Sequence, residues 1–393
     1  MRFLLSLLAL CVSSFGFTQI LSINDSASPE SSYGPEELVK NVMISSSCSS
    51  ADTFTFQVHA APSDLTTKSY GYFKRPTGST FPFEEGVILT NGSAFPAGNT
   101  ESPDIVTNSN GDPGDTDLEV ALGQTNTYDA TFIKFNFTPQ VSNIDFRFIM
   151  ASEEYDGNTE CSFADSFAFL LREVGTTNYT NLAVLPDGTP VSVRNINNAD
   201  NCRSNPEYFE GYGLVNTNTN YGGRTKVLTA SSAVTPGVIY EIKLVVADQG
   251  DYAWDSAIFI EGGSFNLGGD LGDDRLISNG NPGCVGTAIT LDANLTATGA
   301  TFEWFKDGTV ISGETNSTLQ VLTNGTYSFK ATLVGGCEAT DHVVIEFTPP
   351  PVITTPPTDI LLCETDGNGV EVFDFLANES LVLGSQAATN FPI

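Results

Sequence analysis

The chain has 393 residues and carries 47 acidic against 16 basic side chains, which gives a formal net charge of -31 at pH 7. Nucleic acids and anionic membranes bind proteins mainly through basic residues, so this charge excludes both as principal partners. The length suggests two or three modules, and 36 glycines, 20 prolines and 27 phenylalanines, with almost no amphipathic helical pattern, predict an all-β fold.

Residues 1–18 have the pattern of a secretory signal peptide. Arg2 precedes an apolar run from Phe3 to Val12, and small and polar residues follow. The run is too short to span a membrane, and no other stretch reaches the roughly 20 apolar residues of a transmembrane helix. We therefore expect a secreted or cell-surface protein without a transmembrane segment.

Six of the seven cysteines lie beyond the signal peptide, where disulfides are the default state of an exported protein. No C-x-x-C spacing suggests zinc. Membership of the same module favours two pairs and leaves two cysteines open: Cys161 with Cys202, Cys284 with Cys337, and Cys48 and Cys363 unassigned.

The first element expected after the signal peptide is a helix. Pro35 opens the segment PEELVKNVM, where acids stand in the first turn and Lys40 follows, an order that suits the helix macrodipole. No other segment has a clear helical pattern. Strands are expected from Thr53, in TFTFQV, and then in EGVILTNGS, whose Asn91-Gly92 pair signals a turn.

An acidic stretch follows, because no basic residue lies between Arg75 and Lys134. Its densest part, NGDPGDTDLE, contains Asp112, Asp115 and Asp117. Short acidic loops with glycine are typical of calcium sites, although this spacing does not match an EF-hand. These three residues are therefore either a second acidic site or a solvated loop that faces water.

The segment from Ile144 to Leu171 alternates apolar and polar residues before and after an acidic gap, which predicts two half-buried strands. A preceding strand, ATFIKFNF, is expected to point Ile133, Phe135 and Phe137 inward. The residues from 240 to 265 repeat the arrangement, with one strand before and one after a short acidic loop. We expect two hairpins in one module, each with carboxylates at its tip.

If the sheet brings these tips to the same pole, the carboxylates form one oxygen-rich cage. Like charges held close are costly unless a cation lies among them, and calcium prefers such oxygen ligands. The predicted metal ligands are Glu153, Glu154, Asp165, Asp248, Asp251 and Asp255.

Several motifs of this region together resemble the choice-of-anchor L domain of exported Bacteroidota proteins. They are EEGVILTNGSA, GDTDL, DATFIKFNF, FRFIMASEEY, DSFAFLL, TKVLTASSAVTPGVIYEIKLVVAD and DSAIFIEGGSF. The resemblance covers about residues 35–266 and implies a β-sandwich domain, jelly-roll-like and assigned here to residues 19–268. It also implies a large surface or secreted protein with immunoglobulin-like repeats after this domain, and it carries no known activity.

The C-terminal part predicts further modules. Residues 275–348 contain short strands at sandwich spacing, with Trp304 as the core tryptophan, and resemble an immunoglobulin-like module of the PKD type. Residues 349–357 form a Pro-rich linker. Residues 358–393 resemble the start of a further repeat, so we expect the chain to be a fragment.

Three functions are compatible with these patterns. The sequence offers few catalytic candidates for a glycosidase-type hydrolase. The chain holds only His59 and His342, and the adjacent Glu153 and Glu154 point to opposite faces of a strand, so they cannot form a catalytic pair. A lectin-like carbohydrate-binding module would use an aromatic platform beside the acids, made of Tyr252 and Trp254. The interpretation that we favour is not an enzyme but a calcium-stabilised adhesion or surface-presentation module, with an extracellular surface, glycan or protein as partner.

Overall fold

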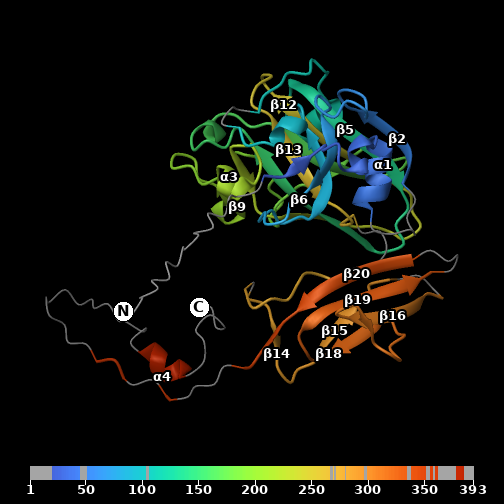
Figure 1. Ribbon diagram of the computed structural model, residues 1–393, viewed down its shortest axis with the longest axis vertical. Coiled ribbons are helices and arrows are strands. Elements are labelled where there is room, and N and C mark those ends of the chain that lie inside the picture. The colour runs from blue at the N-terminus through green and yellow to red at the C-terminus, as the bar shows by residue number, and fades with distance from the viewer. Residues whose placement is uncertain are drawn as a thin grey trace, which may run out of the picture. The chain divides into compact units, whose positions relative to one another are not determined.

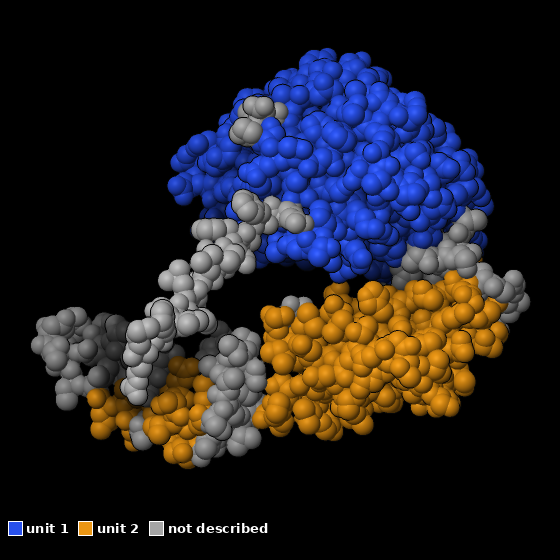
Figure 2. All heavy atoms as spheres, in the orientation of Figure 1, with its two compact units in different colours: residues 1–45, 49–139, 143–267 blue, residues 46–48, 140–142, 268–393 orange. Residues whose placement is uncertain are grey.

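The computed structural model describes residues 20–44, 51–102, 106–265, 269, 271–278, 280–295, 299–333, 338–350, 355–356, 359–361 and 378–384. The chain divides into two compact units (Figure 2). Unit 1 comprises residues 1–45, 49–139 and 143–267, and unit 2 comprises residues 46–48, 140–142 and 268–393. The predicted signal peptide, Cys48, Cys337, Cys363 and most of the predicted linker and final repeat lie outside the described residues.

Unit 1 is built from two antiparallel sheets (Figure 1). The larger sheet runs β1 (Ser22–Ile23), β3 (Tyr70–Lys74), β4 (Glu85–Thr90), β13 (Ser256–Glu261), β6 (Asn143–Ser152), β10 (Gly223–Thr225) and β9 (Phe209–Tyr212), and β11 (Leu228–Ala233) also pairs with β6. The smaller sheet runs β2 (Asp52–Gln57), β5 (Thr127–Phe137), β12 (Tyr240–Gln249), β7 (Ser166–Glu173) and β8 (Thr180–Asn181).

Aromatic side chains from the two sheets meet in the core. Phe146 of β6 lies 4.9 Å from Phe169 of β7 between ring centroids, and Phe148 of β6 lies at the same distance from Phe169. Ile133 and Phe135, predicted to point inward, are fully buried. Each such side chain contributes roughly 1.5–3 kcal/mol through its burial. The fold is therefore an all-β sandwich, as the sequence predicts.

The helices are short. The predicted helix is confirmed as α1 (Pro35–Leu38), which continues as one π turn at Val39–Met43. The structure adds α2 (Thr116–Leu122), which the sequence reading took for an acidic loop: the Asp115 side chain accepts a hydrogen bond from the Leu118 amide and caps it. The other helical turns are Pro29–Ser32, Phe95–Ala97, Thr159–Cys161, Pro206–Tyr208, α3 (Leu214–Thr217) and α4 (Glu379–Leu383).

The two predicted hairpins are wrong. Strand β6 lies in the larger sheet and β7 in the smaller one, and β12 and β13 are divided in the same way. The apolar runs do not reveal this, because strand pairing is decided by the neighbours: β6 pairs with β13, and β7 pairs with β12. The acidic loops between them therefore cross from one sheet to the other.

Unit 2 consists of short strands. β14 (Gly283–Cys284) pairs with β21 (Phe347–Thr348), and β15 (Ile289–Asp292) pairs with β18 (Thr318–Val321). A third sheet runs β17 (Thr309–Val310), β16 (Thr301–Lys306), β19 (Gly325–Thr332) and β20 (Glu338–Ile345). Trp304 is fully buried, as predicted, and its indole nitrogen donates to the Asn316 carbonyl oxygen at 2.8 Å.

One predicted disulfide is confirmed and the other is wrong. Cys161 and Cys202 are bonded, with their Cα atoms 5.5 Å apart. Cys284 carries a free, exposed thiol.

Among the described residues, no helix combines the length and the apolar character needed to cross a membrane.

Candidate functional site: a buried carboxylate cluster

The ends of several strands of unit 1 bring five of the six predicted metal ligands together. The carboxylate cluster comprises Glu153 and Glu154 directly after β6, Asp165 directly before β7, Asp248 near the end of β12, and Asp255 directly before β13. All five side chains are buried, with 8% or less of their surface exposed. The sixth predicted ligand, Asp251, is exposed in the loop between β12 and β13.

Asn91, which follows β4, joins the two sheets inside the cluster. Its Nδ2 group donates to Asp165 Oδ2 at 2.8 Å and to Asp248 Oδ1 at 2.5 Å, and its Oδ1 accepts from the Ser256 amide at 2.7 Å. Asn91 directly follows a strand of the larger sheet, whereas Asp165 directly precedes a strand of the smaller sheet and Asp248 lies within another. Sequence reasoning noted Asn91 only as a turn signal and missed this role.

Backbone amides hold the remaining carboxylates. Glu153 Oε1 accepts from the Val106 amide at 3.0 Å, and Glu154 Oε2 accepts from the Asp165 amide at 2.8 Å. Asp255 Oδ1 accepts from the Asn108 amide at 3.3 Å, but its Oδ2 is buried with no hydrogen-bond partner among the described residues.

Gly92 lies against that unpartnered oxygen, where a Cβ atom would stand only 1.6 Å from Asp255 Oδ2. Real Cβ contacts are never this close, so only glycine lets the chain pass the carboxylate at this point. The unpartnered oxygen and the close approach of the backbone show how tightly the cluster is enclosed.

Burial raises the pKa of each carboxyl in the cluster. It raises the pKa of Glu153 to about 7 and that of Asp255 to about 8. Burial also raises the pKa of Glu154, Asp165 and Asp248, and in each case the charge of a neighbouring carboxylate adds to the effect.

No described lysine or arginine forms an ion pair with any carboxylate of the cluster. Within the described residues, no three side chains of the types that ligate metals are arranged to hold an ion as they stand. The cluster therefore gathers buried carboxyl oxygens that have no basic partner among the described residues.

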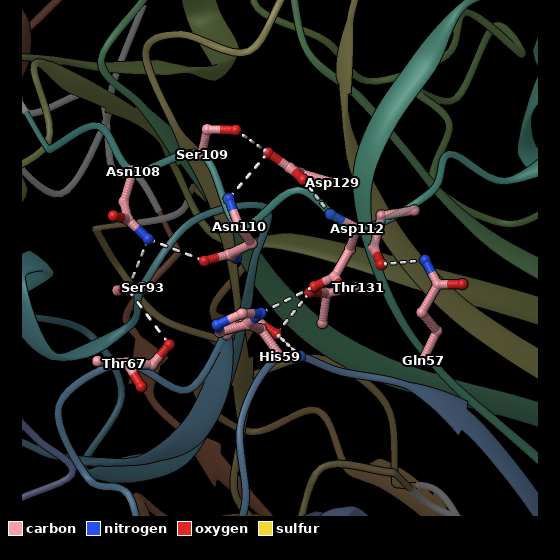
Figure 3. A network of polar contacts seen from close by, with 12 residues as sticks. Gln57, His59, Thr67, Ser93, Asn108, Ser109, Asn110, Asp112, Asp129 and Thr131 are labelled. Atoms are coloured by element: carbon pink, nitrogen blue, oxygen red, sulfur yellow. Dashed lines mark hydrogen bonds and ion pairs between the residues drawn. The ribbon is translucent and has the colours of Figure 1, made fainter.

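The loop before α2 is tied to the cluster by a polar network (Figure 3). Asp129 accepts from Ser109 Oγ at 3.0 Å and from the amides of Asn110 and Asp112 at 3.0 and 2.6 Å. Asn110 Nδ2 in turn donates to the carbonyl oxygen of Asn91 at 3.0 Å. Asp112, one residue of the predicted second acidic site, thus belongs to a network that positions Asn91.

The other two residues of that second site are paired with a buried lysine. Lys243 Nζ contacts Asp115 Oδ2, and it also contacts Asp117 Oδ2 at 2.8 Å. Asp112 instead lies next to His59, with 3.1 Å between Oδ2 and Nδ1 (Figure 3). A cation at these three aspartates stays a prediction, and it would have to compete with the Lys243 ammonium group.

Glu160, in the loop between β6 and β7, lies outside the carboxylate cluster and stabilises the loop itself. Its carboxylate is fully buried and accepts from the Gly157 amide at 2.9 Å and from Tyr212 Oη at 2.6 Å. These bonds fold the loop back on itself. The disulfide at Cys161 closes the same loop against Cys202.

The predicted aromatic platform lies on the loop that joins Asp248 and Asp255. Tyr252 is 47% exposed, and its ring lies 4.3 Å between centroids from that of Tyr128. Trp254 is half-buried. The ring that packs against Tyr252 is that of Tyr128, a residue that the sequence analysis did not single out. Trp254 has a φ of 68°, a left-handed conformation that is rare for a bulky residue.

Residues 24–266 match the family profile described as Choice-of-anchor L domain. A comparison with curated proteins gave no match. Among solved structures, the adhesin domain of Epf from Streptococcus pyogenes is similar, with 10% identity over 58% of this chain and 75% of that chain and a TM-score of 0.17. A β-1,2-glucanase from Parabacteroides distasonis matches with 9% identity over 79% of this chain and 39% of that chain, with a TM-score of 0.21. Scores this low do not indicate a shared function.

Proposed function

The chain belongs to the choice-of-anchor L domain family, and from this premise we propose that it is a non-catalytic module of an exported surface protein. In this proposal it serves adhesion or surface presentation, and calcium stabilises its fold.

The buried carboxylate cluster carries the calcium part of the proposal. Five acidic side chains are buried at one end of the sandwich, and none forms an ion pair with a described residue. Burying several like charges is unfavourable unless they are protonated or share a cation. The unpartnered Asp255 Oδ2 supports a cation in particular, because it is an acceptor for which no described donor remains.

Calcium suits these ligands better than smaller cations. It takes six to eight oxygens in a flexible arrangement, whereas magnesium demands a near-ideal octahedron. The described side chains do not form a ready coordination shell, so calcium binding would require the carboxylates to move closer together. Extracellular sites of this kind bind at about 10⁻⁴ to 10⁻³ M.

A catalytic role has weaker support. Asp112 Oδ2 contacts His59 Nδ1 as the orienting acid of a general base would, yet within the described residues no hydroxyl or thiol hydrogen-bonds to the other ring nitrogen. The carboxylates that a glycosidase would need are buried instead of lining an open cleft.

The proposal also covers the export of the chain and the role of unit 2. A signal peptide at residues 1–18 would export the chain, and an origin in Bacteroidota would agree with the sequence resemblance. Unit 2, with its short strands around Trp304, would serve as an immunoglobulin- or PKD-like spacer. Such a spacer holds a preceding module away from its surface.

The experiment compares the whole chain with an Asp165→Ala, Asp255→Ala double variant by differential scanning calorimetry. Each protein is measured in excess chelator, in millimolar calcium and in millimolar magnesium. At about 10 mM calcium, a site with a Kd of about 10⁻⁴ M is at 100 times its Kd and gains about 2.7 kcal/mol, so calcium should raise the unit 1 transition by several degrees.

The double variant should lose this calcium gain, and magnesium should not reproduce it in either protein. An Asp187→Ala variant is the matched control, because it removes an exposed acid of the same unit outside the cluster and should keep the gain. A gain of equal size in the double variant would contradict the site assignment, and no gain in the unaltered chain would contradict calcium stabilisation.

A further inference from the structure

The loop between β12 and β13 presents one tyrosine ring to solvent. The Tyr252 ring is backed by the Tyr128 ring at 4.3 Å between centroids, and 47% of Tyr252 remains exposed. The backing ring supports Tyr252, and nearly half of the Tyr252 surface stays in contact with solvent. A rigid, half-exposed tyrosine offers a large contact area at a low entropic cost, which is typical of recognition surfaces.

Two neighbouring segments fix the backbone of this loop. The Gly250 amide donates to the Asn126 carbonyl oxygen at 3.0 Å, next to Tyr128. The Trp254 amide donates to Thr107 Oγ1 at 3.1 Å, and the Asp255 amide donates to the Val106 carbonyl oxygen at 3.2 Å. The loop is therefore held at both ends, and its tip carries Tyr252.

The same loop keeps Trp254 in a left-handed backbone conformation at φ 68°. For a residue with a Cβ atom this conformation costs of order 1–3 kcal/mol and persists only where the surroundings enforce it. The conformation turns the chain so that Asp255 enters the carboxylate cluster directly after Trp254. One short loop thus carries both the exposed aromatic tip and a carboxylate of the buried cluster.

The polar surroundings of the tyrosine pair restrict the ligand. Asn126 and Asp251 are exposed, closely precede Tyr128 and Tyr252 in the chain, and present an amide and a carboxylate. Such groups bond to hydroxyl groups, while the flat ring packs against the C–H face of a pyranose sugar. The exposed Asp251 and the net charge of -31 repel anionic ligands such as uronic acid polymers.

We propose that Tyr252, backed by Tyr128, forms a stacking surface for a neutral polysaccharide. This inference rests on the proposed adhesion function and gives it a ligand class. Calcium in the carboxylate cluster would order the loop from below, because Asp248 and Asp255 stand at its two ends.

The test is affinity electrophoresis of the whole chain through native gels that contain laminarin, mannan or xylan, with alginate as the anionic probe and calcium in the buffer. Tyr252→Ala removes the exposed ring. Tyr252→Phe keeps the ring and removes only its hydroxyl group. Phe56→Ala is the matched control, because Phe56 is an aromatic residue of the same unit that is 50% exposed on the edge strand β2.

At least one neutral polysaccharide should retard the unaltered chain, Tyr252→Phe and Phe56→Ala. Tyr252→Ala should bind about tenfold more weakly, which corresponds to about 1.4 kcal/mol. Equal retardation of Tyr252→Ala and the unaltered chain, retardation by alginate alone, or no retardation by any neutral probe would overturn the inference.

Calorimetry of the same variants separates this inference from the proposed function. Tyr252→Ala should keep the full calcium gain in melting temperature. A calcium gain without polysaccharide binding would overturn the stacking surface alone, and binding without a calcium gain would overturn the calcium site alone.

Discussion

Replacement of Asn91 by aspartate tests the carboxylate cluster at its centre. The change keeps the size of the side chain but replaces the amide group that donates to Asp165 and Asp248 by a further carboxylate oxygen. Hydrogen bonds to charged groups are worth about 1.5–3 kcal/mol each, so the loss of two donors should cost about 3–6 kcal/mol in chelator. For a unit of this size, that lowers the melting temperature by roughly 10 °C or more.

Calcium should reverse much of this loss, because the added carboxylate is one more ligand for the ion. The calcium gain of Asn91→Asp should therefore exceed that of the unaltered chain in calorimetry. Asn24→Asp is the matched control: Asn24 is also fully buried, but its side chain bonds to the Tyr70 carbonyl oxygen and the Tyr72 amide, and not to a carboxylate of the described residues. It should be destabilised without a calcium-dependent recovery.

Two results would refute this reasoning. One is an Asn91→Asp variant that is as stable as the unaltered chain in chelator, since Asn91 would then not hold the carboxylates together. The other is an equal calcium gain in Asn91→Asp, Asn24→Asp and the unaltered chain, which would mean that the ion binds elsewhere.

Two further predictions concern the surroundings of the cluster. Gly92→Ala should lower the free energy of unfolding by about 1–3 kcal/mol or more in chemical denaturation, because a Cβ atom would collide with Asp255 Oδ2. The control Gly34→Ala, where the nearest atom is 3.5 Å from the added Cβ, should lose less than about 1 kcal/mol. Equal losses in the two variants would contradict the close approach. Burial lowers the pKa of Lys68 from 10.5 to about 8, so its charging opposes folding below pH 8 and the opposition fades as the pH rises to about 10.5. The unaltered chain should therefore gain about 3 kcal/mol of stability as the pH rises from 8 to 10.5, and Lys68→Met should lack this gain. Parallel pH profiles of the two proteins would contradict this prediction.

The strands could be predicted because their apolar residues alternate and face a core. Phe135 and Trp304 are buried as their patterns indicate. The pairing of the strands could not be predicted in the same way, because β6 and β7 are adjacent in sequence yet belong to different sheets. Alternation reports which face of a strand is buried and does not report which neighbour it bonds to.

The candidate site was predicted in part for a related reason. Like-charged residues on both loops suggested a shared pole, and the structure buries Asp165 and Asp255 there together. Asn91 escaped prediction because an Asn-Gly pair is commonly only a turn signal, and nothing in the sequence reports contacts across 74 and 157 residues of chain. Asp115 was assigned to a loop because a helix cap and an acidic ligand use the same residue types.

Isothermal titration of the whole chain with calcium, after removal of divalent ions by chelator, tests the central claim most directly. Saturable binding at about 10⁻⁴ to 10⁻³ M that is lost in the Asp165→Ala, Asp255→Ala double variant is the result that we predict. No saturable binding, or the same binding in the double variant, would contradict a calcium site in the carboxylate cluster.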